Sequence, residues 1–210
     1  MFITLEGIEG SGKTTQIDRL ATFIENSGTE CVTTRQPGGT IIGENIRSIL
    51  LNPSNHSLQP MTELLLYLAD RAQHINEIIR PALKAGKTVL CDRYFDATIV
   101  YQGFARGLNV ELLLDLHRIL FDNLKPDVTL LLDLSPQQGL ERAWQQLNNG
   151  QRVGRESRFE NEALAFHEKV RAGYLELARL EPQRYRIIDA AQSPDQVFAE
   201  ICKILSSFLK

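Results

Sequence analysis

Residues 2–15 read FITLEGIEGSGKTT, a short apolar run followed by a glycine-rich turn, a lysine and two threonines. The apolar residues 2–5 predict a buried strand, and helical periodicity begins after the turn with Ile17, Leu20 and Ile24. A strand, a Gly-x-x-x-x-Gly-Lys-Thr turn and a helix in this order form the P-loop arrangement. Glycines let the backbone N–H groups of such a turn surround a polyphosphate, and the helix N-terminus adds partial positive charge. The stretch therefore predicts nucleotide binding.

The residues of this loop have separate expected parts in holding ATP. We expect Lys13 to reach the β- and γ-phosphates and the Thr14 hydroxyl to ligate Mg²⁺. The charge of Glu9 cannot favour a bound phosphate, so a sugar hydroxyl or the metal is its expected partner. The ATP-binding residues expected in the loop are Gly7, Ile8, Glu9, Gly10, Ser11, Gly12, Lys13, Thr14 and Thr15.

The composition is that of an ordinary soluble globular protein. With 210 residues, 43% of them hydrophobic, the chain predicts one domain over residues 1–210. The net charge of −3 gives no basic footprint, which disfavours a nucleic acid polymer as partner. Cys31, Cys91 and Cys202 are odd in number and widely spaced, which favours reduced thiols. No apolar stretch has membrane-spanning length and no charged leader precedes the first strand, so we expect a cytoplasmic protein with no membrane contact.

Strand and helix patterns alternate along the whole chain, which predicts an α/β fold with a doubly wound parallel sheet of P-loop NTPase type. Strands are expected at residues 2–5, 30–34, 88–91, 128–134 and 185–188. Helices are expected at 41–51, 60–86, 95–104, around 113–120, at 136–147, up to about 180, and from about 197 to 208. Residues 148–160 are polar and rich in glycine and arginine, which predicts a short mobile lid.

Charged residues follow several of these strands. Asp92 and Arg93 end the expected strand at 88–91, where open α/β sheets place their ligands, so Asp92 is a candidate for orienting Mg²⁺. A strand-end ion pair without chemistry is the alternative. The lid arginines Arg152, Arg155 and Arg158 suit the charge of a transferring phosphoryl group, but a solvated charged loop is equally compatible. The four histidines lack metal spacing and are interpreted as structural or surface residues.

Several longer motifs occur in a specific order: TRQPGGT at 34–40, LADRAQH at 68–74, DRYFDATIVYQG at 92–103, LLLDLSP at 130–136 and RFENEALAFHEKV at 158–170. From residue 2 to about 191 the chain resembles thymidylate kinases of the bacterial type. The resemblance implies transfer of the γ-phosphoryl group of ATP to thymidine monophosphate (dTMP), with Mg²⁺, on a five-stranded parallel sheet flanked by helices. It also implies a homodimer.

The resemblance assigns roles to individual residues. Arg35 and Arg93 match arginines that hold the acceptor phosphate, and Tyr67 and Arg71 match residues that stack on thymine and bond its carbonyl. The implied dTMP-binding residues are Glu9, Arg35, Arg47, Tyr67, Arg71, Arg93, Thr98, Tyr101 and Gln102. The implied catalytic residues are Lys13, Arg93, Arg158 and Glu9, the implied metal ligands are Thr14 and Asp92, and Arg142 joins the ATP-binding set.

Three positions depart from the family pattern: Gln36 stands where Glu is usual, Ala97 where Ser is common, and Ser157 where Asp usually precedes the lid arginine. The first two are expected to loosen the acceptor site, and the third leaves the lid role open between Arg155 and Arg158. A deoxynucleoside kinase is an alternative function, but its acceptor lacks the phosphate that Arg35 and Arg47 would bind. A non-catalytic P-loop switch would leave the thymine-pocket residues without a role.

Overall fold

Five parallel strands form one sheet, and the P-loop strand lies at its centre. The computed structural model describes residues 1–149 and 156–209. The strand order is β2 (Cys31–Arg35), β3 (Thr88–Asp92), β1 (Phe2–Glu6), β4 (Val128–Asp133) and β5 (Tyr185–Asp189). All four neighbouring pairs are parallel. The predicted doubly wound, five-stranded α/β fold is therefore confirmed.

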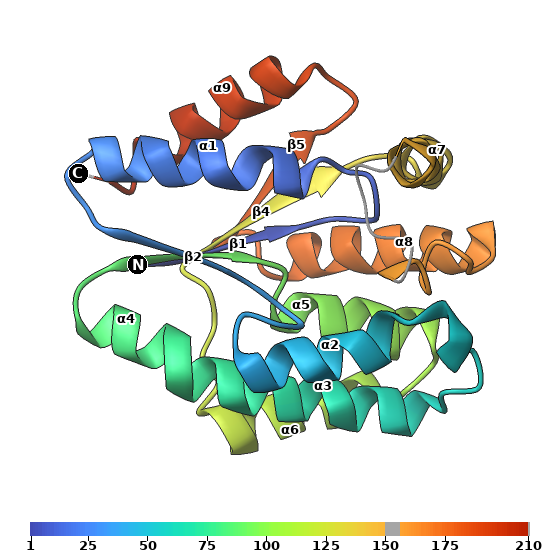
Figure 1. The fold of residues 1–210 in the computed structure, drawn as a ribbon. Coiled ribbons are helices and arrows are strands. Elements are labelled where there is room, and N and C mark those ends of the chain that lie inside the picture. Colours follow the sequence, from blue (N-terminus) through green and yellow to red (C-terminus); the bar gives the residue numbers. More distant parts are fainter. Residues whose placement is uncertain (150–155, 210) are drawn as a thin grey trace.

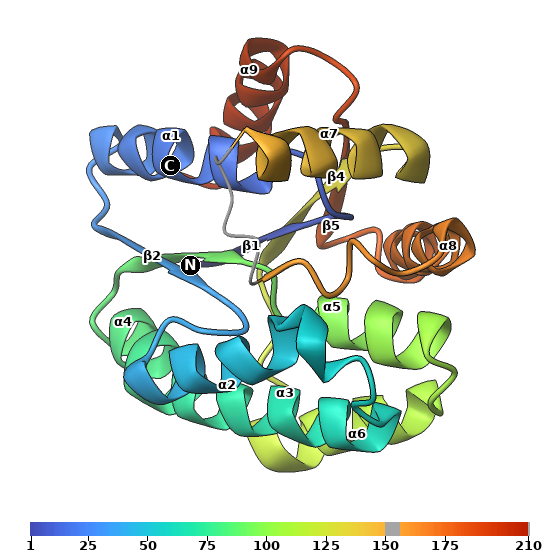
Figure 2. The same ribbon diagram turned by 45° about the vertical axis from the view of Figure 1, so that its right-hand side comes forward.

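Helices cover both faces of this sheet. On one side lie α1 (Lys13–Asn26), α7 (Pro136–Asn148) and α9 (Pro194–Leu205) (Figures 1 and 2). The other side carries α2 (Ile41–Leu51), α3 (Pro60–His74), α4 (Arg80–Lys84), α5 (Phe95–Thr98) and α6 (Val110–Phe121). Helix α8 (Leu164–Leu180) runs beside the last two strands. A short 3₁₀ turn spans Pro53–Asn55.

Two of the expected helices contain π-helical segments. Between α3 and α4 the segment η2 (Ile75–Ile79) is π-helical, and η3 (Ile99–Ala105) continues α5 in the same way. Pro81 lacks an N–H group, and its ring would crowd the carbonyl four residues earlier in a regular helix. The wider turn ahead of Pro81 relieves that conflict, and η3 carries two of the expected substrate residues, Tyr101 and Gln102.

The strand register brings three sequence motifs to one edge of the sheet. Leu5 of β1 and Arg35 of β2 both pair with Asp92 of β3. Beyond the strands, the Arg93 N–H donates to Leu5 O at 3.0 Å, and the Gln36 N–H donates to Asp92 O at 2.9 Å. The P-loop, the Asp-Arg-Tyr turn and the TRQPGGT loop therefore meet at the carboxyl edge.

The structure also tests the predicted burial of the strands, the end of the last helix and the state of the cysteines. The strand at β4 is buried on both faces, as its apolar run predicts, whereas β2 forms a partly exposed sheet edge. Helix α9 ends at Leu205, so Phe208 lies beyond it. All three cysteines are free thiols. None of the helices in the described part of the chain has the length and apolar character needed to cross a bilayer.

Candidate active site

The P-loop is pressed against helix α7 through two glycines. Gly10 has a φ of +70°, and a Cβ atom there would lie 2.0 Å from the carbonyl oxygen of Gly139. A Cβ atom on Gly139 would lie 2.5 Å from the carbonyl oxygen of Glu9. Both positions therefore require glycine, because any larger residue would push the loop away from α7.

Lys13 is buried beneath this loop and folds back onto it. Its Nζ donates to the carbonyl oxygens of Gly7 at 3.0 Å and Ile8 at 2.9 Å, and to Ser11 Oγ at 3.2 Å. Burial and the nearby charge of Arg93 lower the pKa of Lys13 to about 8. The ammonium group is thus still charged at neutral pH and lies at the position from which a lysine reaches nucleotide phosphates.

Glu9, Arg93 and Tyr101 form a tight cluster beside the P-loop. Arg93 Nη2 donates to Glu9 Oε1 at 2.9 Å, to the Tyr101 hydroxyl at 3.0 Å and to Gly7 O at 3.1 Å. The Tyr101 hydroxyl in turn donates to Glu9 Oε1 at 2.6 Å, and His167 Nδ1 lies 3.2 Å from Glu9 Oε2. Burial opposes ionisation of Glu9, but its contacts with His167 and Arg93 hold its pKa well below the usual range. The carboxylate is therefore charged and fixed in place.

A buried glutamate holds the turn that presents Arg93. Arg93 has a φ of 63°, in the left-handed region that is rare for residues other than glycine. Glu6 Oε1 accepts the N–H of the next residue, Tyr94, at 2.8 Å, and Glu6 Oε2 accepts the Tyr174 hydroxyl at 2.7 Å. Burial and the charge of Asp96 raise the pKa of Glu6 to about 7. Glu6 thus connects β1, the Asp-Arg-Tyr turn and α8.

An open cleft next to the P-loop contains the expected phosphate and metal residues. Its lining includes Lys13, Thr14, Thr15, Arg35 and Asp92. Asp92 Oδ1 is buried and accepts no hydrogen bond from any residue that the structure describes. No three His, Cys, Asp or Glu side chains of the described residues form a metal cluster there or elsewhere. A magnesium ion needs no such cluster when one or two protein oxygens act together with substrate phosphates, so Thr14 and Asp92 fit this ion.

A second, smaller pocket of about 560 Å³ opens beside this cleft. Residues that line both include Glu9, Gln36, Arg47, Arg93 and Glu156. The remaining lining residues of the pocket are Pro37, Leu51, Tyr67, Arg71, Tyr94, Ala97, Thr98, Tyr101, Gln102, Phe159 and Glu160. The structure thus brings together the expected acceptor residues except Arg35, which lines only the cleft and pairs with Glu44 at 2.8 Å.

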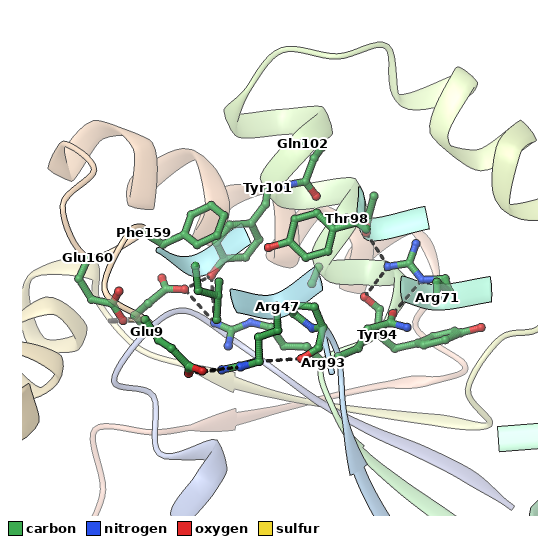
Figure 3. A pocket seen from close by; sticks show the side chains of 16 residues that line it. Glu9, Arg47, Arg71, Arg93, Tyr94, Thr98, Tyr101, Gln102, Phe159 and Glu160 are labelled. Atoms are coloured by element: carbon green, nitrogen blue, oxygen red, sulfur yellow. Dashed lines mark hydrogen bonds and ion pairs between the residues drawn. The ribbon is translucent and has the colours of Figure 1, made fainter. Parts of the chain in front are cut away.

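Arg71 lies at one end of the pocket, away from Glu9 and Arg93 (Figure 3). Its side chain is 1% exposed. Nε donates to Gln36 Oε1 at 2.8 Å and Nη2 donates to Thr98 Oγ1 at 2.6 Å. Nη1 is buried and has no hydrogen-bond partner among residues 1–149 and 156–209. The pocket therefore contains a strong hydrogen-bond donor that a ligand can satisfy.

Arg47 connects the pocket with the end of the lid segment. Its guanidinium donates to both carboxylate oxygens of Glu156, at 3.0 and 2.7 Å, and to Pro37 O at 2.8 Å. Because a phosphate would compete with Glu156 for the same donors, this pair is expected to break when a phosphate binds.

Arg158 makes its side-chain hydrogen bonds to helices α2 and α3. Its Nη2 donates to Glu63 Oε2 at 2.6 Å, its Nε donates to Leu50 O, and its backbone N–H donates to Leu51 O at 3.2 Å. It is absent from the lining of both pockets, so this geometry gives no support to a catalytic contact and instead ties Arg158 to α2 and α3. Arg152 and Arg155 lie outside the described residues.

Arg142 also lies apart from both linings, where its Nη1 donates to Ala190 O at 2.9 Å. Its expected part in ATP binding has no counterpart in these contacts.

Several polar residues of this region are not predicted by the sequence patterns. His167, interpreted as structural or surface, contacts Glu9, and Glu63 accepts hydrogen bonds from Arg158 and Gln102. A signal for part of this set is present in α3, where Glu63, Tyr67, Asp70, Arg71 and His74 recur at helical spacing and form a polar stripe among leucines.

The chain is similar to known proteins over nearly its whole length. The family model described as thymidylate kinase matches residues 5–201. A thymidylate kinase of Desulfosudis oleivorans is 59% identical over 190 residues, covering 90% of this chain and 89% of that protein. One of Syntrophotalea carbinolica is 54% identical over 209 residues, covering 99% and 96%. The crystal structure of thymidylate kinase from Ehrlichia chaffeensis superposes with a TM-score of 0.75 at 33% identity, covering 98% of each chain. The chain therefore belongs to the thymidylate kinase family.

Proposed function

We propose that the chain transfers the γ-phosphoryl group of ATP to dTMP, giving ADP and dTDP, with ATP in the P-loop cleft and dTMP in the smaller pocket. The observation that carries this assignment is that the two spaces meet at Glu9 and Arg93. An acceptor phosphate bound by Arg93 would then lie next to phosphates bound by Lys13. That arrangement suits direct in-line transfer, in which positioning and charge stabilisation supply most of the catalysis.

The residues divide the work of transfer. Lys13 exchanges its carbonyl partners Gly7 and Ile8 for phosphate oxygens of ATP. Arg93 holds the acceptor phosphate while Glu9 and Tyr101 fix the guanidinium. Bound Mg²⁺ would neutralise charge on the donor phosphates, with Thr14 and Asp92 as its protein ligands. Arg35 and Arg47 contribute further guanidinium groups to the acceptor phosphate once Glu44 and Glu156 release them.

The far end of the pocket is suited to thymine. Arg71 Nη1 would donate to a base carbonyl, Tyr67 would stack on the ring, and Thr98 and Gln102 would meet the base edge. Uracil presents the same carbonyl, whereas cytosine presents an amino group and leaves Nη1 unsatisfied. Tyr101, held by Glu9, leaves little room for a ribose 2′-hydroxyl. We therefore expect dTMP and dUMP as substrates and rejection of dCMP and UMP.

A coupled assay of ADP formation tests this function. ATP, Mg²⁺ and dTMP should give turnover, whereas thymidine or no acceptor should not. Lys13→Ala should remove nearly all turnover while the fold survives. Turnover with thymidine alone would indicate a deoxynucleoside kinase, and nucleotide binding without turnover would indicate a switch. Near wild-type activity of Lys13→Ala would exclude the P-loop as the donor site.

Selectivity is measured separately as kcat/KM for dTMP, dUMP, dCMP and UMP in wild type and Arg71→Ala. Equal use of dCMP by the wild type, or selectivity unchanged in Arg71→Ala, would mean that α3 packs without recognising the base.

We further propose that the protein is a homodimer that acts in the cytoplasm, where three free thiols stay reduced. Large apolar side chains are exposed on α2, α3 and α6, which lie on one side of the sheet (Figures 1 and 2). They include Ile42, Ile49, Met61, Leu65, Ile119 and Leu120. A surface of this kind favours a protein partner. Light scattering should give a dimer mass for the wild type and a monomer mass for Leu65→Glu; a wild-type monomer would contradict the proposal.

A further inference from the structure

A line of polar side chains runs from Arg71 through Gln36, which also lines the pocket, to His74 and Thr34. Arg71 Nε donates to Gln36 Oε1 at 2.8 Å, Gln36 Nε2 lies 3.3 Å from His74 Nδ1, and His74 Nε2 lies 2.6 Å from Thr34 Oγ1. Gln36 and His74 are 4% and 0% exposed. The three residues Thr34, Gln36 and His74 therefore form a relay that is largely shielded from solvent, and the proposed reaction gives none of them a part.

The direction of every hydrogen bond in this relay follows from Arg71. A guanidinium can only donate, so the Gln36 oxygen must face Arg71 and the Gln36 amide nitrogen must face His74. His74 Nδ1 is then an acceptor, which places the ring proton on Nε2, from where it donates to Thr34. Burial and the charge of Arg71 lower the pKa of His74 to about 4, which agrees with a neutral ring.

Two fixed points determine where the third nitrogen of Arg71 points. The guanidinium is planar, and its Nε and Nη2 are held by Gln36 and Thr98. Its described hydrogen bonds all go to neutral oxygens, the third being Tyr94 O at 3.5 Å. The charge is thus not neutralised by a hydrogen-bonded carboxylate, and Nη1 alone is left for a ligand.

We propose that Gln36 and His74 are positioning residues that hold Arg71 so that Nη1 faces the edge of the base. This inference rests on the proposed function of the pocket. The TRQPGGT loop braces the relay from outside, because a Cβ atom on Gly39 would lie 2.6 Å from Thr34 Oγ1 and 3.0 Å from His74 Nε2. Asp70, on the same helix as His74, accepts the Gly38 N–H at 2.9 Å. The relay is therefore clamped between the loop and α3.

Kinetics of four variants test this proposal. Gln36→Leu removes the acceptor of Arg71 Nε, and we expect about a tenfold rise in KM for dTMP and about a tenfold fall in the preference for dTMP over dCMP. Any rise in KM for ATP should be smaller, although Gln36 also lines the cleft. Gln36→Glu keeps an acceptor and should restore both values. His74→Leu should give a smaller effect of about threefold, and the double variant Gln36→Leu/His74→Leu should be no worse than Gln36→Leu, because the two act in series.

His117→Leu is the matched control. His117 is another buried histidine, bonded to Leu124 O at 2.9 Å and absent from the pocket lining. Its replacement should lower the melting temperature without changing the preference for dTMP. An unchanged dTMP KM and preference in Gln36→Leu, or an equal rise in the ATP KM, would overturn the proposal.

Nitrogen NMR of the ring gives an independent measurement, which decides the matter if Gln36→Leu does not fold. Wild-type His74 should show the neutral Nε2–H tautomer, and Gln36→Glu should move a proton to Nδ1 because a carboxylate can only accept. A wild-type ring protonated at Nδ1 would refute the relay. Loss of selectivity in Arg71→Ala but not in Gln36→Leu would refute the relay alone, whereas selectivity retained in Arg71→Ala would refute the proposed role of Arg71 in base recognition, on which the relay rests.

Discussion

Replacement of Glu63 or Arg158 tests whether the lid segment is anchored by a buried ion pair. Glu63 is 0% exposed and Arg158 is 6% exposed, and they meet at 2.6 Å. Glu63 also accepts from Gln102 at 2.8 Å and from Arg106 at 3.4 Å. Glu63→Ala therefore leaves three side chains without their shared acceptor, and Arg158→Ala leaves a carboxylate without its main partner.

The expected cost follows from this burial. Removing one partner of a buried ion pair costs about 3–5 kcal/mol, because the other charge stays desolvated. For a chain of this size each kcal/mol lowers the melting temperature by about 2–4 °C, so each single variant should melt about 6–20 °C lower. A double variant, Glu63→Leu with Arg158→Met, should recover much of this loss, because neither charge is then stranded.

Calorimetry and urea unfolding measure the stability, and initial rates measure kcat in the same samples. An arginine that contacts the transferring phosphoryl group is worth about 10³-fold in kcat, and only Arg158→Ala would show that loss. The anchoring geometry predicts instead that Glu63→Ala and Arg158→Ala lower kcat alike. A stability change below about 1 kcal/mol, or a large kcat loss confined to Arg158→Ala, would refute the anchor.

Three further changes have defined outcomes. Burial raises the pKa of Glu6 to about 7, above the unfolded value of 4.5. The contribution of Glu6 to stability is therefore complete below pH 4.5 and declines by about 3 kcal/mol as the pH rises through 7. Urea unfolding at pH 5 to 8 should show that the free energy of unfolding falls less with pH in Glu6→Gln than in the wild type. Glu156→Gln weakens the competitor for Arg47 and should lower KM for dTMP about threefold, and a raised KM would contradict this. Tyr101→Phe should still exclude UMP but weaken dTMP binding, because Arg93 loses a hydroxyl partner. Tyr101→Ser should accept UMP as a substrate. If kcat/KM for UMP did not rise in Tyr101→Ser, exclusion of the 2′-hydroxyl by the bulk of Tyr101 would be contradicted.

Local patterns were sufficient to predict most of the fold. Each strand was found within two residues of its ends, because buried parallel strands give short apolar runs between turn residues. The π-helical segments at 75–79 and 99–105 were not predicted. The hydrogen bonds of a π-helix span one residue more than those of an α-helix, and one or two such turns are too short for apolar periodicity to register the difference.

Part of the candidate site could also be predicted from local sequence, and part could not. The P-loop and the Asp-Arg-Tyr turn are contiguous, and their chemistry can be interpreted directly from neighbouring residues. The ion pair between Glu63 and Arg158 could not be predicted in this way, because the two residues are 95 positions apart and no residue near either one indicates the other. The sequence alone made Arg158 a candidate for the phosphates, while the fold gives it a nearer carboxylate.

Gln36 shows why a departure from a family pattern has to be interpreted in three dimensions. Compared with the family pattern, the loss of a carboxylate at this position predicts a looser acceptor site. The amide oxygen still accepts from Arg71, so the bond is kept and only the charge is lost. The amide also gains a donor, and His74 one helical turn after Arg71 supplies the acceptor that this donor needs. A carboxylate at position 36 could only accept, so it would require the His74 proton on Nδ1; the amide at position 36 instead leaves Nδ1 as the acceptor and places the proton on Nε2.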